Sequence, residues 1–357
     1  MKEKVVIAMS GGVDSSVAAY LLKEQGYDVI GITMQVWPKE NCSLDIREKG
    51  CCGLSAVNDA RAVAEKLDIP YYVLNFREIF KKHVIDDFCN EYSNGRTPNP
   101  CLKCNQYIKF DALLKKAHEL GAKYIATGHH AQVEFDKDTA RYCLKKAEDD
   151  KKDQTYFLYI LTQHQLEHTL MPVGNMPKSE VRKIAEIAGL CVAQKKESQE
   201  ICFVIDDNYR NFLTERAPES LKKGSIVDVN GNVLGEHNGI AFYTIGQRKG
   251  MGVAAKHPLY VKGLDKETNT IVAAEKQDLY SSELFATDMN MIRVVKEKES
   301  VRADIKVRYG ESSAKGTFTL TEGAVKVVFD EPVWAITPGQ SVVFYDGDYV
   351  IGGATIQ

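Results

Sequence analysis

Residues 10–16, Ser-Gly-Gly-Val-Asp-Ser-Ser, constrain the fold of this chain more than any other stretch. An apolar run at 5–9 precedes them, and a helical pattern at 17–22 follows. A buried strand that turns sharply into a helix makes an anion site, because the two glycines let backbone N–H groups approach a ligand closely. The amino terminus of the helix adds partial positive charge at the same place. The segment therefore predicts a phosphate-binding loop.

The polar residues of this loop indicate which phosphate compound it would hold. The Ser15 and Ser16 hydroxyls can reach phosphate oxygens, and Asp14 stands where Walker-type loops carry a lysine. A carboxylate there suggests Mg²⁺ bound to pyrophosphate. The pattern resembles the loop of the ATP pyrophosphatases, which cleave ATP between the α- and β-phosphates and adenylate an oxygen of their substrate. The alternative is an ordinary glycine-rich turn, and the flanking strand and helix argue against it.

The composition indicates a folded protein of two or three domains, because 357 residues are too many for one simple core. Hydrophobic residues make up 44% and charged residues 27% of the chain, as in typical globular proteins. The sequence shows no apolar run of membrane-spanning length and no charged-then-apolar leader, so we expect a cytoplasmic protein without a membrane partner. In a reducing compartment its nine cysteines would be buried, catalytic or metal-binding.

The net charge of −3 gives no overall attraction to nucleic acid. An RNA partner would have to be bound by local basic patches, and Lys/Arg pairs occur at 145–146, 151–152, 182–183, 195–196 and 248–249. Taken singly, each pair is more often a solvated face than a binding site.

About the first 130 residues alternate strand and helix signals, which is typical of a parallel doubly wound sheet. The pattern predicts strands at 5–9, 27–34, 71–74 and 124–130, and helices at 17–22, from Ser55 to Leu67 and at 109–120. Ligands bind beyond the carboxyl ends of such strands, which would bring the loop, Met34 and Gly128-His129 to one crevice. Helical patterns resume over 156–190.

Beyond Gly224, short β-rich runs alternate with turn signals. Asn230-Gly231 and Asp346-Gly347 between apolar runs are strong hairpin signals. We expect a small β-rich central domain followed by a C-terminal antiparallel β-barrel or sandwich. The predicted division is a nucleotide-binding catalytic domain over 1–205, the central domain over 206–280 and the barrel over 281–357.

Cys101-Leu102-Lys103-Cys104 is the second feature with chemical content, because the prolines at 98 and 100 stiffen the loop that presents it. Cys202 is a third candidate for a reactive or metal-binding cysteine, because the basic pair at 195–196 could hold its thiol partly ionised. Three interpretations stay open: half a zinc site, a redox or sulfur-transfer pair, or three ligands of an iron–sulfur cluster. A structural zinc site needs a fourth ligand, and the adjacent Cys51 and Cys52 have a poor geometry for supplying it. Four other cysteines are interpreted most simply as small buried hydrophobic residues: Cys42, Cys89, Cys143 and Cys191.

Short motifs spread along the whole chain match one known family; they are residues 8–15, Met34, 96–110, Gly128, 152–158, 201–203, 244–250 and 337–341. Through these motifs the chain resembles the tRNA-specific 2-thiouridylase (MnmA) family. The resemblance implies an adenine nucleotide α-hydrolase-like first domain. It also implies a tRNA-uridine 2-sulfurtransferase, which adenylates O2 of the wobble uridine, replaces it by sulfur and releases AMP and pyrophosphate.

The resemblance further implies roles for single residues. Cys104 would be the nucleophile and Cys202 the persulfide carrier, and the two would form a disulfide. ATP contacts would come from Ala8, Met9, Ser10, Gly11, Gly12, Val13, Asp14, Ser15, Met34 and Gly128, with Mg²⁺ on Asp14. The tRNA contacts would be Asn99, Pro100 and Cys101 against the target base, and His129, Lys152, Asp153, Gln154, Arg308, Tyr309 and Gln340 elsewhere. The implied partners are tRNA and a sulfur source, which is either a persulfide-carrying donor protein or sulfide. Neither DNA nor a membrane is expected as a partner.

One departure matters, because the family frequently has an aspartate where this chain has Cys101. Cys101, Cys104 and Cys202 are then three catalytic sulfurs, the number that would hold a 4Fe-4S cluster with one iron open to external sulfide. The extra thiol favours the cluster over the persulfide relay, and both stay open. Another pyrophosphatase-loop adenylating enzyme is an alternative, against which the cysteines and C-terminal motifs argue. The second alternative is a non-catalytic RNA- or ATP-binding relative. The presence of Asp14 and Cys104 argues against it.

Overall fold

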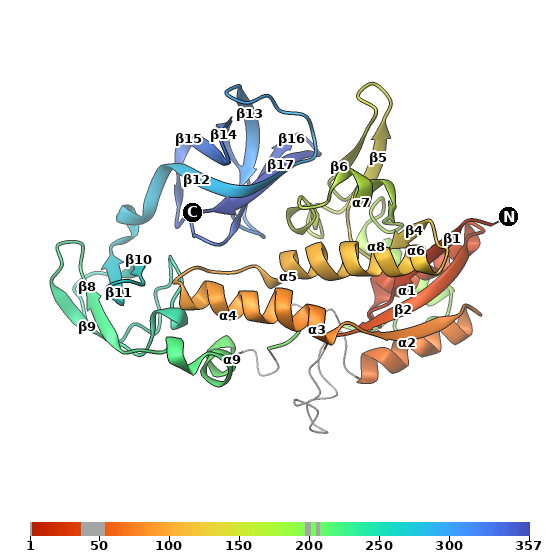
Figure 1. The fold of residues 1–357 in the computed structure, drawn as a ribbon, viewed down its shortest axis with the longest axis horizontal. Coiled ribbons are helices and arrows are strands. Elements are labelled where there is room, and N and C mark those ends of the chain that lie inside the picture. Colours follow the sequence, from red (N-terminus) through yellow and green to blue (C-terminus); the bar gives the residue numbers. More distant parts are fainter. Residues whose placement is uncertain (1, 37–53, 197–200, 205–207) are drawn as a thin grey trace. The chain divides into compact units, whose positions relative to one another are not determined.

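The structure is a computed structural model that describes residues 2–36, 54–196, 201–204 and 208–357 (Figure 1). Of the cysteines interpreted above, Cys42, Cys51 and Cys52 lie outside the described residues. The chain divides into two compact units. The first unit comprises residues 1–84, 101–207 and 348–350, and the second comprises 85–100, 208–347 and 351–357.

The first unit contains a parallel five-stranded sheet of strand order β3-β2-β1-β4-β7. The strands are β1 Lys4–Ala8, β2 Asp28–Gln35, β3 Tyr71–Asn75, β4 Tyr124–Ala126 and β7 Thr169–Leu170. The direction of winding reverses between β1 and β4, which is where open parallel sheets bind ligands. The sheet confirms the predicted fold class of this part of the chain.

Three helices pack against the sheet through an apolar face of β1. Alternate residues of β1 and the segment after it, Val5, Ile7 and Met9, pack into one buried cluster with three helices. These helices are α1 Val13–Glu24, α2 Leu54–Lys66 and α8 Lys178–Ile187. Helix α2 begins at Leu54, one residue before the predicted start at Ser55.

The helical pattern expected over 156–190 is wrong for most of its length. The structure has a 3-10 turn at Thr155–Phe157, helix α7 at Gln163–Glu167, strand β7 and then α8. Pairing of β7 with β4 overrides the local preference, because backbone groups at a sheet edge need partners. The sequence pattern also did not indicate the antiparallel hairpin of β5 Gln132–Asp136 and β6 Arg141–Lys145.

Along the chain, the Cys-x-x-Cys motif lies within a run of helices. Its members are α3 Arg77–Phe80, a π-helix at Lys81–Ile85, α4 Asp86–Ser93, α5 Pro100–Lys103, a π-helix at Cys104–Ala112 and α6 Leu113–Glu119. The helix predicted over 109–120 thus begins earlier and is π-type in its first half. Ile108, Phe110 and Leu113 are fully buried and anchor it. π-helical turns are rare and are frequent at functional sites.

The second unit contains α9 Tyr209–Arg216 and two β structures. A four-stranded sheet of order β10-β11-β8-β9 uses β8 Gly224–Val227, β9 Val233–His237, β10 Tyr260–Asp265 and β11 Thr270–Ala274. An antiparallel barrel follows, made of β12 Tyr280–Met291, β13 Ser300–Lys306, β14 Ala314–Thr321, β15 Ala324–Trp334, β16 Ser341–Asp346 and β17 Tyr349–Ile356. Pairing of β12 with β17 closes the barrel, which confirms the predicted barrel.

The two predicted hairpin turns are confirmed. Gly231 lies between β8 and β9 with φ +86°, and Gly347 lies between β16 and β17 with φ +56°. Both angles are in the left-handed region that favours glycine. Inside the barrel, Phe318 stacks on Phe344 with ring centroids 4.1 Å apart. Among the described residues, every helix is too short or too polar to cross a bilayer.

Candidate active site

The predicted phosphate loop connects β1 to α1 in the first unit. Gly11 has φ +67°, and a Cβ there would lie 2.2 Å from the carbonyl oxygen of Ala56, so only glycine fits. Gly12 is the N-cap residue of α1, and no side chain caps this helix. Within the described part of the chain, the first-turn N–H groups therefore have no side-chain cap, and the turn from strand to helix has the expected geometry. Phosphate binding by this loop stays a prediction.

Gly128 follows β4 and contacts the start of α1. A Cβ on Gly128 would lie 2.5 Å from the backbone nitrogen of Ser15 and 2.6 Å from the carbonyl carbon of Asp14. Glycine is needed here for close approach of two backbone segments. Met34 lies near the carboxyl end of β2 and is half-buried. The loop, Met34 and Gly128 thus lie at the carboxyl edge of one sheet.

Asp14 is the acidic centre of the loop. The Nζ atom of Lys178 lies 2.6 Å from each of its carboxylate oxygens, and Nε2 of His130 lies 3.1 Å from Oδ1. Burial alone would raise the pKa of Asp14, but the hydrogen bonds from His130 and Lys178 and the charge of Lys178 hold it below the ordinary value of 3.8. Asp14 is therefore an anion paired with a nearly buried ammonium group.

Sequence reasoning missed both partners of Asp14. Lys178 begins α8, where the positive end of the helix dipole disfavours a cation, and this misplaced charge was the available signal. The sequence motif indicates the neighbouring His129, whereas the structure places His130 against Asp14. The backbone N–H of His130 donates to Oε1 of Gln154 at 2.9 Å, so Gln154, a predicted tRNA contact, also holds His130 in place.

A second lysine contacts the loop. Nζ of Lys195 lies 3.0 Å from the carbonyl oxygen of Gly11 and 2.5 Å from Oδ2 of Asp59. The guanidinium of Arg182 donates to the carbonyl oxygens of Ala193 and Lys195 at 3.0 and 3.2 Å. Two of the basic pairs considered as RNA patches therefore include residues that organise the phosphate loop.

The two serine hydroxyls bond within the loop itself. Oγ of Ser15 donates to the carbonyl oxygen of Gly12 at 3.1 Å and lies 3.3 Å from the backbone nitrogen of Ser10. Oγ of Ser16 donates to the same carbonyl at 2.9 Å, and Ser16 is fully buried. Ser16 thus stabilises the start of the helix instead of presenting a hydroxyl at the surface.

Cys101 and Cys104 lie on one continuous helical stretch, Cys101 in α5 and Cys104 at the start of the next π-helix. Residues three apart in a helix share a side, so both thiols face the same region. Cys101 is exposed and Cys104 is half-buried. Asn105 donates through Nδ2 to the carbonyl oxygen of Phe157 at 3.0 Å, which ties this helix to the 3-10 turn.

Cys202, also half-buried, lies between two stretches that are outside the described residues. Its neighbour Phe203 is buried and packs edge-on against Phe80, with ring centroids 5.8 Å apart. This aromatic contact anchors the Cys202 segment within the first unit.

Two predicted tRNA contacts of the first unit are buried. Nδ1 of His129 lies 2.8 Å from Oγ1 of Thr127, and burial together with the charges of Lys109 and His130 places the pKa of His129 well below 6.5. Asp153 accepts hydrogen bonds from the Ala147 backbone N–H at 3.2 Å and from the Thr155 hydroxyl at 2.7 Å. Both side chains have structural partners, and their contact with RNA stays a prediction, as does that of Lys152.

In the second unit, two predicted tRNA contacts, Arg308 and Gln340, are among the residues that line a cavity of about 330 Å³. Its lining residues are Thr97, Thr244, Ile245, Gly246, Gln247, Arg308, Trp334, Thr337 and Gln340. Arg308 donates to the carbonyl oxygen of Ala335 at 2.9 Å, and its guanidinium lies 6.0 Å from the Trp334 ring centre. Gln340 donates to the carbonyl oxygen of Thr97 at 3.0 Å. The motifs at 244–250 and 337–341, remote in sequence, thus meet at this cavity.

The other predicted contacts of this unit lie nearby in the chain. Tyr309, which follows Arg308, is 43% exposed. Asn99 is half-buried and Pro100 is buried at the start of α5. Their roles at the target base stay predictions.

The fold and the loop define a nucleotide-binding α/β domain joined to two β domains, and family models agree. The model described as the tRNA methyl transferase HUP domain matches residues 3–206, the tRNA methyl transferase PRC-barrel domain matches 210–275 and the aminomethyltransferase beta-barrel domain matches 281–356.

Relatives that match along their whole length identify the protein family more closely. The tRNA-specific 2-thiouridylase MnmA of Acetivibrio thermocellus is 54% identical over 357 residues, which are 100% of this chain and 99% of the relative. The protein of that name from Clostridium perfringens is 55% identical over 357 residues, with the same coverage. That of Clostridioides difficile is 53% identical over 358 residues, again with 100% and 99% coverage. The chain belongs to the tRNA-specific 2-thiouridylase family, as its sequence motifs predicted.

Proposed function

We propose that this chain catalyses the ATP-dependent 2-thiolation of the wobble uridine of tRNA. O2 of the uridine attacks the α-phosphorus of ATP and pyrophosphate leaves. Sulfur then attacks C2, and AMP leaves with the former O2. The observation that carries the proposal is the uncapped start of α1 with Asp14, Lys178 and His130 beside Gly128, in a chain of the thiouridylase family.

The cations at the loop support pyrophosphate departure. Backbone N–H groups of α1 and the ammonium of Lys178 would stabilise the charge that develops on the leaving group. The phosphates of ATP offer Lys178 a new anionic partner, which would release the carboxylate of Asp14. A carboxylate oxygen is a ligand suited to Mg²⁺, so Asp14 would hold the ion that neutralises the pyrophosphate charge.

Two sulfur routes fit the cysteines. In the persulfide route, the terminal sulfur of a Cys202 persulfide attacks C2, and the Cys104 thiolate then attacks Sγ of Cys202. This step forms the Cys104–Cys202 disulfide and leaves the terminal persulfide sulfur bonded to C2 of the base. An external thiol must reduce the disulfide before another turnover.

In the cluster route, Cys101, Cys104 and Cys202 would hold a 4Fe-4S cluster, whose chemistry would be to bind external sulfide for delivery. Thiolates are the soft ligands such a cluster requires, and Cys101 and Cys104 face the same side of their helix. The thiol at position 101 makes the cluster route the one that we favour.

The RNA would be held by separated contacts, because a wobble base must leave its stack to reach the ATP α-phosphate. Lys152 and Gln154 of the first unit, and Arg308, Tyr309 and Gln340 of the second, are the proposed contacts, with Asn99, Pro100 and Cys101 at the base. Sulfur would come from a persulfide-carrying protein or from sulfide, in the cytoplasm. We keep the domain borders at 205 and 280 in this proposal.

The test is reconstitution with protein purified without oxygen. A tRNA transcript with a wobble uridine, ATP, Mg²⁺ and a sulfur source should yield AMP, pyrophosphate and 2-thiouridine, the last identified by mass spectrometry of nucleosides. A matched transcript with cytidine at that position should give none of the three above background. Equal pyrophosphate release with both transcripts, without 2-thiouridine, would contradict the proposal and favour another adenylating activity.

A further inference from the structure

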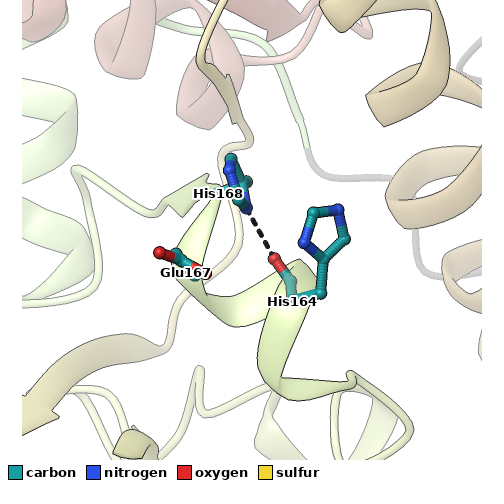
Figure 2. A group of neighbouring side chains, drawn as sticks. All are labelled: His164, Glu167 and His168. Atoms are coloured by element: carbon teal, nitrogen blue, oxygen red, sulfur yellow. Dashed lines mark hydrogen bonds between the residues drawn. The ribbon is translucent and has the colours of Figure 1, made fainter.

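A cluster of histidines and one acid lies outside the site described above. Among the described residues, His164, Glu167 and His168 are the only three metal-ligating side chains whose ligand atoms all lie within 4.8 Å of one another. They come from the short helix α7 and the residue that follows it (Figure 2). His118 on α6 lies beside them, with its ring centre 5.2 Å from that of His168 and 6.0 Å from that of His164.

The tautomer of His168 is suited to a metal ligand. Its Nδ1 lies 2.8 Å from the carbonyl oxygen of His164, the bond drawn in Figure 2. A carbonyl only accepts, so Nδ1 carries the proton and the lone pair of Nε2 is left for a ligand bond. Metal-bound histidines commonly donate their other N–H to a backbone carbonyl in this way.

The backbone under the cluster is held by several hydrogen bonds, while the side chains of His164 and Glu167 are exposed and open to a ligand. Thr162 and Gln165 form a reciprocal capping box at the start of α7. The Gln163 side chain bonds both the N–H and the carbonyl of Tyr142 on β6, each at 2.9 Å. The carbonyl oxygen of His168 accepts from the N–H of Ile125 at 2.9 Å, which joins the cluster to β4.

We propose that His118, His164, Glu167 and His168 form a binding site for a divalent ion of the zinc or nickel type. Imidazole nitrogens with one carboxylate oxygen are the donor set that such ions take in proteins. His168 directly precedes β7, so the site lies at the amino edge of the sheet, whereas the phosphate loop lies at the carboxyl edge. The ion would therefore join α6 to α7 and stabilise the β4–β7 end of the sheet, with no part in catalysis.

The experiment compares metal binding to the whole protein and to variants, after chelator treatment and dialysis. His164→Gln combined with His168→Asn removes two ligand atoms, and the asparagine amide can still donate to the His164 carbonyl. Calorimetric titration with Zn²⁺ and with Ni²⁺ should show one equivalent more in the unchanged protein than in this double variant. His257→Gln, at an exposed histidine elsewhere, is the matched control and should bind like the unchanged protein.

The difference in metal stoichiometry between the unchanged protein and the double variant does not include metal bound by the cysteines, because all these proteins have the same cysteines. Zn²⁺ should raise the midpoint of thermal unfolding in the unchanged protein and the control but much less in the double variant. His118→Ala should weaken binding by about tenfold or more. The same stoichiometry and affinity in the unchanged protein and the double variant would overturn the site. Unchanged affinity in His118→Ala would overturn the four-ligand set.

Discussion

Lys178 places its ammonium nitrogen 2.6 Å from both carboxylate oxygens of Asp14, although the two residues are 164 positions apart in the chain. The side chain of Lys178 is only 9% exposed, so its charge needs an anion. Asp14 supplies that anion in this structure. The phosphate groups of a nucleotide at the start of α1 would supply another, so nucleotide binding would exchange the anionic partner of Lys178.

Lys178→Met should lower tRNA-dependent pyrophosphate release by on the order of 100-fold, because a preorganised cation at the leaving group is lost. Lys183→Met is the matched control, since Lys183 is exposed on the same helix α8. It should leave the rate nearly unchanged. Initial rates of pyrophosphate release at saturating ATP check both variants, and a near-normal rate in Lys178→Met would contradict a role for this lysine.

Asp14→Ala should abolish pyrophosphate release and lower the free energy of unfolding by up to about 3 kcal/mol, because it leaves Lys178 nearly buried without its partner. The protein should still fold. Asp14→Ala combined with Lys178→Met should recover most of that stability and none of the activity. Urea unfolding of the four proteins measures the coupling, and purely additive losses would show that the pair is not energetically linked.

His129 should make stability depend on pH just below neutrality. Burial and neighbouring positive charge place its pKa in the folded protein well below 6.5. As the pH falls through 6.5, the unfolded chain binds a proton here that the folded chain does not, so stability falls by up to about 1.4 kcal/mol per pH unit. His129→Gln should reduce that slope in urea unfolding between about pH 7.5 and 5.5. Exposed His257→Gln should retain it, and an undiminished slope in His129→Gln would contradict the prediction.

Charge reversal at Lys152 and Arg308 should weaken tRNA binding by about tenfold or more and leave ATP binding unaltered. Each lost phosphate contact also reduces the salt dependence of binding by roughly one unit of slope. Arg302→Glu is the control, because Arg302 is an exposed arginine of the same barrel, paired with Asp330. Gel shifts at several salt concentrations provide the measurement. Unaltered tRNA affinity in the double variant would show that the proposed RNA contacts of Lys152 and Arg308 are wrong.

Cys101→Ala separates the two sulfur routes. Under the cluster route the variant, purified without oxygen, should lose bound iron and tRNA thiolation together, because one of three ligands is gone. Under the persulfide route it should stay active with a persulfide donor, since Cys104 and Cys202 suffice. Iron and acid-labile sulfide analysis accompanies assays with sulfide and with a persulfide donor. Full activity with no iron in either protein would eliminate the cluster.

The parts predicted correctly from sequence are those whose signals are local. The sharp turn from β1 into α1 needs only a strand, two glycines and a helix start, all within residues 5–22. The turns at Gly231 and Gly347 need only a positive φ between two apolar runs. The family motifs are likewise short stretches whose chemistry can be recognised in order along the chain, which is why the first domain's fold and the barrel were predictable.

Tertiary structure decided the features that depend on partners distant in the chain. Strand β7 exists because β4 offers an open edge to the short stretch Thr169–Leu170, although its surroundings favour helix. Lys178 and His130 reach Asp14 only through the packing of α8 and the end of β4 around the loop. Local sequence determines the backbone of the phosphate site, whereas its charge balance comes from long-range contacts, because a buried ion takes whichever opposite charge the fold brings within bonding distance.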